Sequence, residues 1–222
     1  MTNRILVVAP HADDELLGCG GTLLRRRDEG VEVDWLLVTG MSAAAGYAAD
    51  RVARRAEEIA QVAAQVGFRK VTQLGFAPTR LDAQPLGTLV QRIGEAIEEA
   101  QPSEIFVPSP SDVHSDHRVV FDAVAGCAKW FRYPSVRRVL AYETLSETDF
   151  ALDPGAAFRA NVFVDISAQI ERKLELLAIY ASELAAFPFP RSVEAVRALA
   201  QVRGAASGFA AAEAFQLLRE RL

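Results

Sequence analysis

Short apolar runs alternate with longer amphipathic segments along most of this 222-residue chain. The apolar runs are typical of strands buried on both faces of a parallel sheet, and the amphipathic segments are typical of helices. Alternation of the two indicates βαβ units and a mostly parallel sheet. The predicted strands are 5–9, 31–39, 70–74, 104–108, 138–143 and 162–166. The predicted helices are 14–27, 48–66, 86–100, 118–131, 167–184, 192–203 and one beginning near Ala210.

Length, charge and cysteine content narrow the class of protein. The length suits one well-buried α/β domain, and we expect residues 1–222 to form it. The formal net charge of −5 argues against a broad nucleic-acid-binding surface. We see no signal-peptide pattern and no apolar run long enough for a membrane span, and two cysteines fit a reducing compartment. The expected location is therefore cytoplasmic.

All three histidines of the chain lie in two short acidic clusters. The first cluster is His11-Ala12-Asp13-Asp14-Glu15, and the second is His114-Ser115-Asp116-His117. Each follows a predicted apolar strand, and parallel strands present their carboxyl ends at the same edge of a sheet. The two clusters are therefore predicted to lie together. Imidazole and carboxylate are ligands that suit zinc and similar divalent ions.

A catalytic zinc site usually has three protein ligands and one open position. His11 and Asp14 can converge at a strand-to-helix turn, and one histidine of the second cluster would complete the set. Asp13 and the remaining histidine would then be free to move protons or to stabilise an oxyanion. Taken alone, the acidic residues could merely complement a helix dipole. The two clusters together favour a mononuclear metallohydrolase site.

Glycines are concentrated in the predicted helix 14–27, at Gly18, Gly20 and Gly21. They do not form the G-x-G-x-x-G pattern of dinucleotide-binding loops, because Leu23 stands in the place of its third glycine. We expect them to let this helix pack close to neighbouring groups.

The two clusters resemble the signature of the LmbE-like deacetylases, also called the PIG-L family. That signature is His-Pro/Ala-Asp-Asp-Glu followed by a downstream His-x-Asp-His. Residues 55–58 (Arg-Ala-Glu-Glu), 164–167 (Val-Asp-Ile-Ser) and 180–182 (Tyr-Ala-Ser) are similar to weaker motifs of the family. The resemblance extends over nearly the whole chain. It implies an α/β fold of the Rossmann-like type, a three-layer sandwich with a mostly parallel sheet.

The resemblance further implies zinc-dependent removal of an acetyl group from an N-acetylated sugar or a sugar conjugate, although other divalent metals suit the same ligands. The metal ligands carried over by position are His11, Asp14 and His117. Asp13 would be the general base. His114 would stabilise the tetrahedral intermediate and could protonate the leaving amine, while Asp116 would orient His114. Arg55, or its neighbour Arg54, would contact the substrate.

Other features of the resemblance concern the loops and the assembly. Asp112 stands where many members carry Asp or Asn, and it would support the second cluster. Thr79, near Pro78, replaces an aspartate that many members carry. The region of Gly46 and the segment 76–85 are predicted loops at the rim of the site. Members often form homo-oligomers, trimers and hexamers among them, so we expect a homo-oligomer.

Two alternatives stay open at this point. The same metal chemistry would serve a hydrolase of another amide or of an ester, because the clusters define the reacting bond and not the remainder of the substrate. A non-catalytic protein that binds a metal or a sugar is the other alternative. Loss of the base or of a ligand would be expected in such a protein, and none of these residues is missing here.

Overall fold

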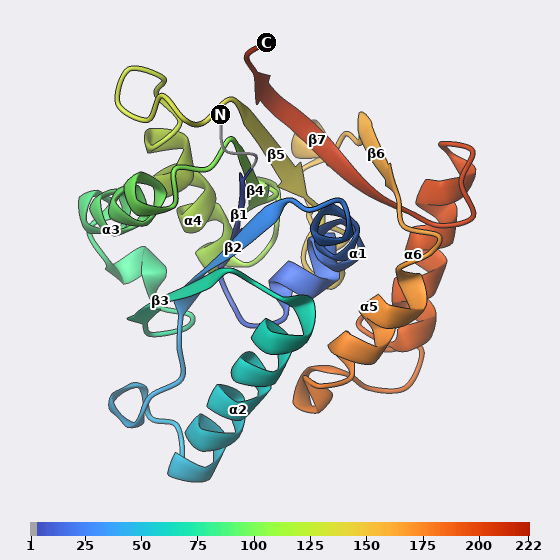
Figure 1. Ribbon diagram of the computed structural model, residues 1–222. Coiled ribbons are helices and arrows are strands. Elements are labelled where there is room, and N and C mark those ends of the chain that lie inside the picture. Colours follow the sequence, from blue (N-terminus) through green and yellow to red (C-terminus); the bar gives the residue numbers. More distant parts are fainter. Residues whose placement is uncertain (1–3) are drawn as a thin grey trace.

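The computed structural model describes residues 4–222 of the chain. Their strands form one seven-stranded sheet (Figure 1). Its strand order is β3-β2-β1-β4-β5-β7-β6. Strands β1 to β5 are parallel to one another, whereas β7 is antiparallel to both β5 and β6. The strands are β1 Arg4–Ala9, β2 Glu32–Thr39, β3 Lys70–Phe76, β4 Glu104–Pro108, β5 Arg138–Tyr142, β6 Val162–Asp165 and β7 Ala212–Glu220. The prediction of a mostly parallel sheet is confirmed.

Helices cover both faces of this sheet and make three layers (Figure 1). Helices α3 and α4 lie on one face, and α1, α2, α5 and α6 lie towards the other. Successive strand residues point to opposite faces, so β1 contributes Val7 to one apolar core and Leu6 and Val8 to the other. The helices are α1 Asp14–Asp28, α2 Ala49–Val66, α3 Leu86–Ala100, α4 Ser115–Gly126, α5 Ile170–Leu177 and α6 Val193–Ala205. This is the predicted Rossmann-like three-layer α/β sandwich.

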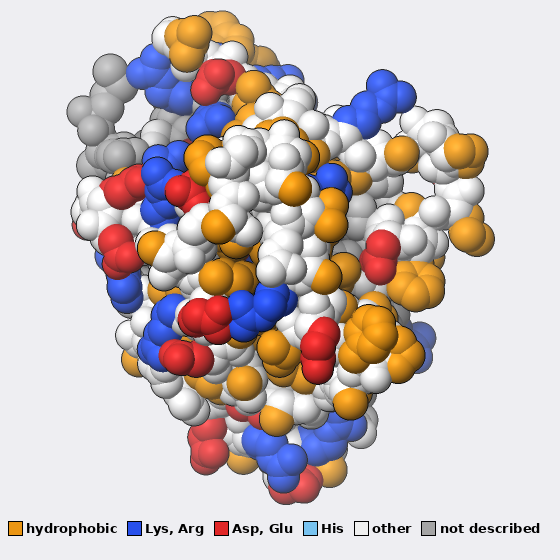
Figure 2. Space-filling view, turned by 90° about the vertical axis from the view of Figure 1, so that its right-hand side faces the viewer, with side chains coloured by type: hydrophobic (Ala, Val, Ile, Leu, Met, Phe, Trp, Pro, Cys, Tyr) orange, Lys and Arg blue, Asp and Glu red, His pale blue; other side chains and the backbone are white. Residues whose placement is uncertain are grey.

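The side of the molecule that carries α5 and α6 has a surface of mixed character. Figure 2 shows hydrophobic side chains interspersed with acidic and basic ones over this side. Val193 and Val202 of α6 are among its exposed apolar residues. An ion pair between Arg197 of α6 and Glu171 of α5 lies at the same surface. Charges of both signs therefore alternate here, which differs from the continuous basic surface of nucleic-acid-binding proteins.

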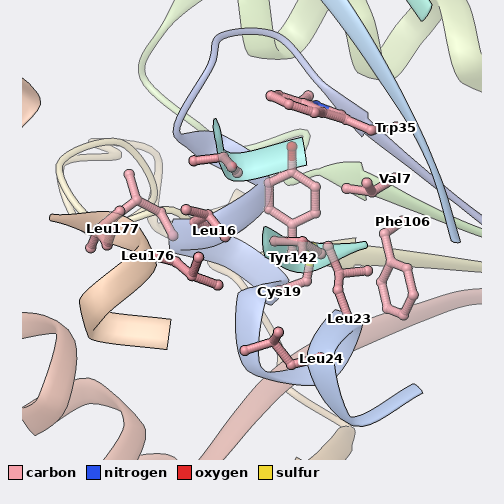
Figure 3. Close-up of a cluster of buried hydrophobic side chains, with 14 of the residues drawn as sticks. Val7, Leu16, Cys19, Leu23, Leu24, Trp35, Phe106, Tyr142, Leu176 and Leu177 are labelled. Atoms are coloured by element: carbon pink, nitrogen blue, oxygen red, sulfur yellow. The ribbon is translucent and has the colours of Figure 1, made fainter. Parts of the chain in front are cut away.

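Helix α1 packs tightly against its neighbours through its glycines. A Cβ atom added at Gly18 would lie 2.2 Å from Cδ2 of Tyr142, and one added at Gly21 would lie 2.8 Å from the Ile166 side chain. Larger residues at these positions would therefore push the helix away from the sheet. Figure 3 shows the buried side chain of Leu16 beside Tyr142 in the resulting core. The glycines serve helix packing, as predicted.

A buried ion pair lies at a break in helix α1. The break is at Cys19, whose φ of −144° is not helical. Glu213 on β7 accepts hydrogen bonds from the N–H groups of Gly21 at 2.9 Å and Thr22 at 2.7 Å. Lys173 on α5 lies 2.6 Å from the same carboxylate, and both charged side chains are buried. The pair therefore joins α1, α5 and β7 at one point in the interior.

Most of the second histidine cluster belongs to a helix, although it lies outside the helix predicted at 118–131. The helix predicted at 118–131 begins at Ser115 and ends at Gly126. It begins earlier because the His114 ring caps it, with Nδ1 accepting the N–H of Asp116 at 3.1 Å. Most of the cluster is thus held in the first turn of α4.

Two helical predictions, 118–131 and 167–184, extend too far towards the C-terminus. The segment 167–184 contains only the short helix α5, followed by a 3₁₀ turn at Ala181–Glu183. Trp130, predicted within the helix that ends at Gly126, lies beyond it with 62% of its surface exposed.

Among the helices of residues 4–222, none has both the length and the apolar character needed to cross a bilayer.

The helix predicted to begin near Ala210 is wrong, because this segment forms strand β7. Alanine favours helices, but such propensities are weak compared with tertiary pairing. Here β7 lies between β5 and β6 and supplies hydrogen-bond partners to both. Ala212, Ala214 and Phe215 become buried in the process.

The ion pair at the break in α1 predicts a stability effect. Lys173→Met should lower the free energy of unfolding by about 3–5 kcal/mol, because it leaves the buried Glu213 carboxylate without a counter-charge. Urea unfolding of the metal-free protein measures this. Arg197→Met is the control, since Arg197 pairs with Glu171 at the surface, and it should leave the free energy of unfolding near that of the wild type. Equal losses in the two variants would contradict the prediction.

Candidate functional site

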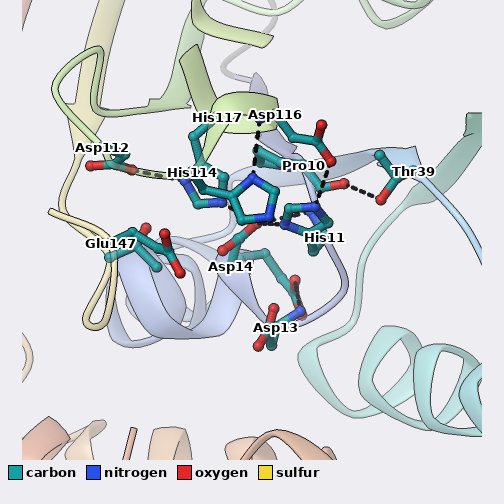
Figure 4. A network of polar contacts seen from close by, with 12 residues as sticks. Pro10, His11, Asp13, Asp14, Thr39, Asp112, His114, Asp116, His117 and Glu147 are labelled. Atoms are coloured by element: carbon teal, nitrogen blue, oxygen red, sulfur yellow. Dashed lines mark hydrogen bonds and ion pairs between the residues drawn. The ribbon is translucent and has the colours of Figure 1, made fainter. Parts of the chain in front are cut away.

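The two histidine clusters meet at the carboxyl ends of β1 and β4, which are paired in parallel. His11 follows β1, and His114 and His117 follow β4. The ring centroid of His11 lies 4.6 Å from that of His114 and 5.4 Å from that of His117, and Figure 4 shows the three rings side by side. The predicted juxtaposition of the two clusters, about a hundred residues apart in sequence, is confirmed.

Three side chains form a set with the spacing of metal ligands. Asp14 Oδ2 lies 3.4 Å from His11 Nδ1 and 3.3 Å from His117 Nε2. All three donor atoms lie within 4.8 Å of one another. Zinc bonds of roughly 2.0–2.1 Å in a tetrahedral site place ligand atoms about 3.3 Å apart. The predicted ligand residues therefore have a geometry and a chemistry that fit zinc.

In both imidazoles of this set, the nitrogen that does not face Asp14 contacts another carboxylate. Asp116 Oδ2 lies 2.9 Å from His11 Nε2, and Asp112 Oδ2 lies 2.8 Å from His117 Nδ1. Such contacts fix the ring orientation and leave the other nitrogen for a metal. A second group of donors, His11, His114 and Asp116, is also close enough for a metal. Its carboxylate is already bonded to the N–H groups of residues 79 and 81, so the set around Asp14 fits better.

The carboxylate of Asp116 contacts His11 and not His114, which it was predicted to orient. His114 instead receives the backbone N–H of Asp116 at Nδ1. A ring that accepts a hydrogen bond at Nδ1 carries its proton at Nε2 when it is neutral. Burial, followed by the charges of His11 and His117, lowers the pKa of His114 to about 4. His114 is therefore a neutral imidazole with a proton to donate from Nε2.

Asp13 has an unusual backbone at the start of helix α1. Its φ of 149° lies in a region that a non-glycine residue occupies at a cost of about 1–3 kcal/mol. Its carbonyl accepts the N–H of Leu16 at 3.0 Å, and its own N–H donates to Glu15 at 3.1 Å. Burial and the neighbouring charge of Asp14 raise the pKa of Asp13 to about 7, against the opposing charge of Arg191. A carboxylate with this pKa is suited to accept a proton near neutral pH.

A cavity of about 210 Å³ contains these groups. His11, Asp13, Asp14, His114 and His117 line it together. The two loops predicted at its rim contribute Tyr47, Pro78 and Thr79. Three charged residues that the sequence did not indicate also line it, namely Glu147, Glu183 and Arg191. Glu147 and Arg191 come from loops that carry no motif. Glu183 ends the 3₁₀ turn beside the 180–182 motif, which was the one signal for it.

Arg55, and not the exposed Arg54, lines this cavity. Its guanidinium is largely engaged by protein groups. Nη1 donates to the carbonyl of Ala12 at 2.8 Å, and Nη2 donates to Glu183 and, at 3.1 Å, to Ser182. The predicted contact between Arg55 and a substrate stays a prediction.

The carboxylate partners of the histidines predict a first effect on metal binding. Asp112→Asn should weaken zinc binding by about 10- to 100-fold, because the ring of His117 loses the charged group that orients it. Zinc affinity is measured by competition with a chromophoric chelator. Asp122→Asn, at an exposed position of α4, is the control and should bind zinc like the wild type. Unchanged zinc affinity in Asp112→Asn would refute the prediction.

The protonation of the histidines predicts a pH dependence of zinc binding. Burial acts to lower both pKa values, but Asp116 and Asp14 raise the pKa of His11 to about 9, and Asp14 and Asp112 raise the pKa of His117 to about 10. Both rings therefore carry protons at pH 7 that zinc must displace. Zinc affinity should rise with pH up to about 9, by about tenfold per pH unit for each displaced proton. Calorimetry in two buffers of different ionisation enthalpy should detect proton release, and no release would contradict this.

Comparisons with known proteins place the chain in a family. Residues 6–128, more than half of the chain, match the family model for PIG-L, described as GlcNAc-PI de-N-acetylase. The chain is 28% identical over 206 residues to diacetylchitobiose deacetylase of Thermococcus kodakarensis, covering 86% of this chain and 72% of that protein. It is 30% identical over 132 residues to the probable N-acetyl-alpha-D-glucosaminyl L-malate deacetylase 2 of Bacillus cereus, covering 56% and 60%.

A solved structure agrees with this match. The conserved protein TT1542 of Thermus thermophilus superposes with a TM-score of 0.79 at 27% sequence identity, covering 100% of this chain and 97% of that one. The similarity therefore extends beyond the segment that the family model matches, to the strands and helices after residue 128. The chain belongs to the PIG-L family, as its two histidine clusters indicated.

Proposed function

We propose that this chain is a zinc-dependent deacetylase that removes the acetyl group from an N-acetylated sugar or sugar conjugate. The observation that carries the proposal is the convergence of His11, Asp14 and His117 beside Asp13 in one cavity. The two relatives named above, whose names describe deacetylases of N-acetylated sugars, support the choice of reaction and substrate class. We further propose that residues 1–222 act as one catalytic domain.

In the proposed amide hydrolysis, different residues bind the metal and accept the proton. His11, Asp14 and His117 would hold the metal, which when bound acts as a Lewis acid that polarises the acyl carbonyl and acidifies water. Asp13 accepts the proton of the attacking water. Its pKa near 7 lets it be ionised before the reaction and, once protonated, deliver that proton to the leaving amine as the C–N bond breaks.

His114 stabilises the negative charge that develops on the acyl oxygen. Its Nδ1 is occupied by the N–H of Asp116, so Nε2–H is the group it can donate. In the metal-free protein the pKa of His114 is about 4, so its ring is neutral at pH 7, a state that suits donation from Nε2–H to an oxyanion. Of the two roles that the resemblance implied for His114, we propose oxyanion stabilisation, which the hydrogen bond at Nδ1 supports.

The residues that line the cavity suit a small polar substrate. Glu147, Glu183 and Arg191 offer hydrogen-bonding partners for hydroxyl groups on one part of the lining, while Leu37 and Ile59 give an apolar surface elsewhere. A sugar with an acetamido group has both kinds of surface.

A homo-oligomer in the cytoplasm stays the prediction for assembly and location.

Acetate release from zinc-loaded protein tests the proposal, with N-acetylglucosamine, diacetylchitobiose and an N-acetylglucosaminyl malate conjugate as substrates. His117→Ala should lose zinc and activity. Asp13→Ala should keep zinc but turn over about 10²-fold more slowly, because it removes only the base. Asp122→Asn, exposed on α4, should behave like the wild type.

Each failure of this experiment points to a different alternative. Cleavage of acyl esters or of longer amides without release from any N-acetyl sugar would favour another metal-dependent hydrolase. Zinc binding without turnover of any acyl substrate would favour a non-catalytic protein. Equal loss of zinc in Asp13→Ala and His117→Ala would show that the roles of base and ligand are assigned wrongly.

A further inference from the structure

The peptide group that joins Ala12 to Asp13 is held at both of its polar atoms. Its carbonyl oxygen accepts a hydrogen bond from Arg55 Nη1 at 2.8 Å. Its N–H donates to Glu15 Oε2 at 3.1 Å. Arg55 is 8% exposed and Glu15 is fully buried, so neither contact is weakened by surrounding water. The plane of this one peptide group is therefore fixed from two sides.

Tyr180 connects the two side chains that hold the peptide group. Its hydroxyl donates to Glu15 Oε1 at 3.0 Å, so both oxygens of that carboxylate are in use. The guanidinium of Arg55 lies 5.3 Å from the centre of the Tyr180 ring, within the range of a cation–π contact. Tyr180 is fully buried and follows α5, outside the residues that match the family model. We call Arg55, Glu15 and Tyr180 the peptide clamp.

The clamp acts next to the strained bond of Asp13. The angle φ of Asp13 describes rotation about the bond that follows this peptide group, and its value of 149° persists only where surrounding contacts determine it. If the peptide plane turned, Asp13 would relax and its carboxylate would leave its place in the cavity. Figure 4 shows Asp13 below Asp14 and the histidines, on the side away from Asp112.

We propose that Tyr180 is a positioning residue, which acts through Glu15 to hold the Asp13 carboxylate in place for proton transfer. This inference depends on the proposed function, in which Asp13 is the general base. Tyr180 itself does not line the cavity and has no contact with reacting atoms. Its effect should therefore appear in the rate of the chemical step and not in substrate or zinc binding.

Removal of one hydroxyl group tests this. In Tyr180→Phe, kcat should fall by about tenfold, since small displacements of a catalytic group have effects of this size or more. KM and zinc content should stay at wild-type values. The matched control is Tyr142→Phe, because Tyr142 is also fully buried but donates to the carbonyl of Val8 and not to the clamp. Tyr142→Phe should lower the melting temperature and retain kcat. Equal kcat values in the two variants would overturn the inference.

A double mutant separates positioning of Asp13 from other effects on the rate. If Tyr180 acts through Asp13, then Tyr180→Phe should have no further effect on the residual rate of Asp13→Ala. If the hydroxyl affects the rate independently of Asp13, the two losses should multiply. Multiplied losses would therefore overturn the inference even if Tyr180→Phe alone is slow.

Hydrogen exchange of the Asp13 amide gives a readout that is independent of activity. In metal-free Tyr180→Phe this amide should exchange about tenfold faster than in the wild type, because Glu15 loses the group that holds it. Glu15→Gln is a second variant with the same expectation should Tyr180→Phe fail to fold. Unchanged exchange overturns the clamp. Faster exchange in a protein that releases no acetate from any substrate would instead leave the clamp intact and refute the proposed function.

Discussion

The parallel pairing of β1 with β4 determines where the two histidine clusters of the candidate site lie. Ile5 pairs with Glu104 and Val7 with Phe106, so both strands end at the same edge of the sheet. Main-chain hydrogen bonds fix this register, and a slip of one residue would turn Val7 out of one core and into the other. The first cluster leaves β1 and the second leaves β4 from adjacent positions. Two segments far apart in sequence thereby become one site.

Buried carboxyl groups surround the histidine rings. Asp13, Asp14, Asp112 and Asp116 are all buried, and Glu15 is buried beside them. Carboxylates are costly to bury without a compensating charge. The raised pKa values of His11 and His117 show how the metal-free protein meets this cost, with protons on the rings. A single divalent cation would supply a comparable positive charge in place of the two ring protons, which is why this arrangement suits a metal ion.

Much of this site could be predicted from the sequence, because its central groups lie in two contiguous motifs after recognisable strands. The detailed pairing could not be predicted. Asp116 contacts His11 and not His114, since the first turn of α4 turns its carboxylate across to the other loop. Glu147 and Arg191 reach the cavity from loops whose path depends on the whole fold. Strand β7 was missed because its alanines favour a helix in isolation, whereas pairing with β5 and β6 decides its structure here.

The position of β7 has a consequence for how the chain acquires its structure as it leaves the ribosome. Strand β6 pairs only with β7, which is made later, so β6 has no partner in the sheet until residues 212–220 emerge. The ion pair of Lys173 likewise cannot form until Glu213 of β7 has been synthesised. The strands that carry the histidine clusters are complete much earlier, at Pro108. Synthesis thus completes the strands that carry the histidine clusters first and the β7–β6 edge of the sheet last, which exposes an unpaired strand edge in the interval.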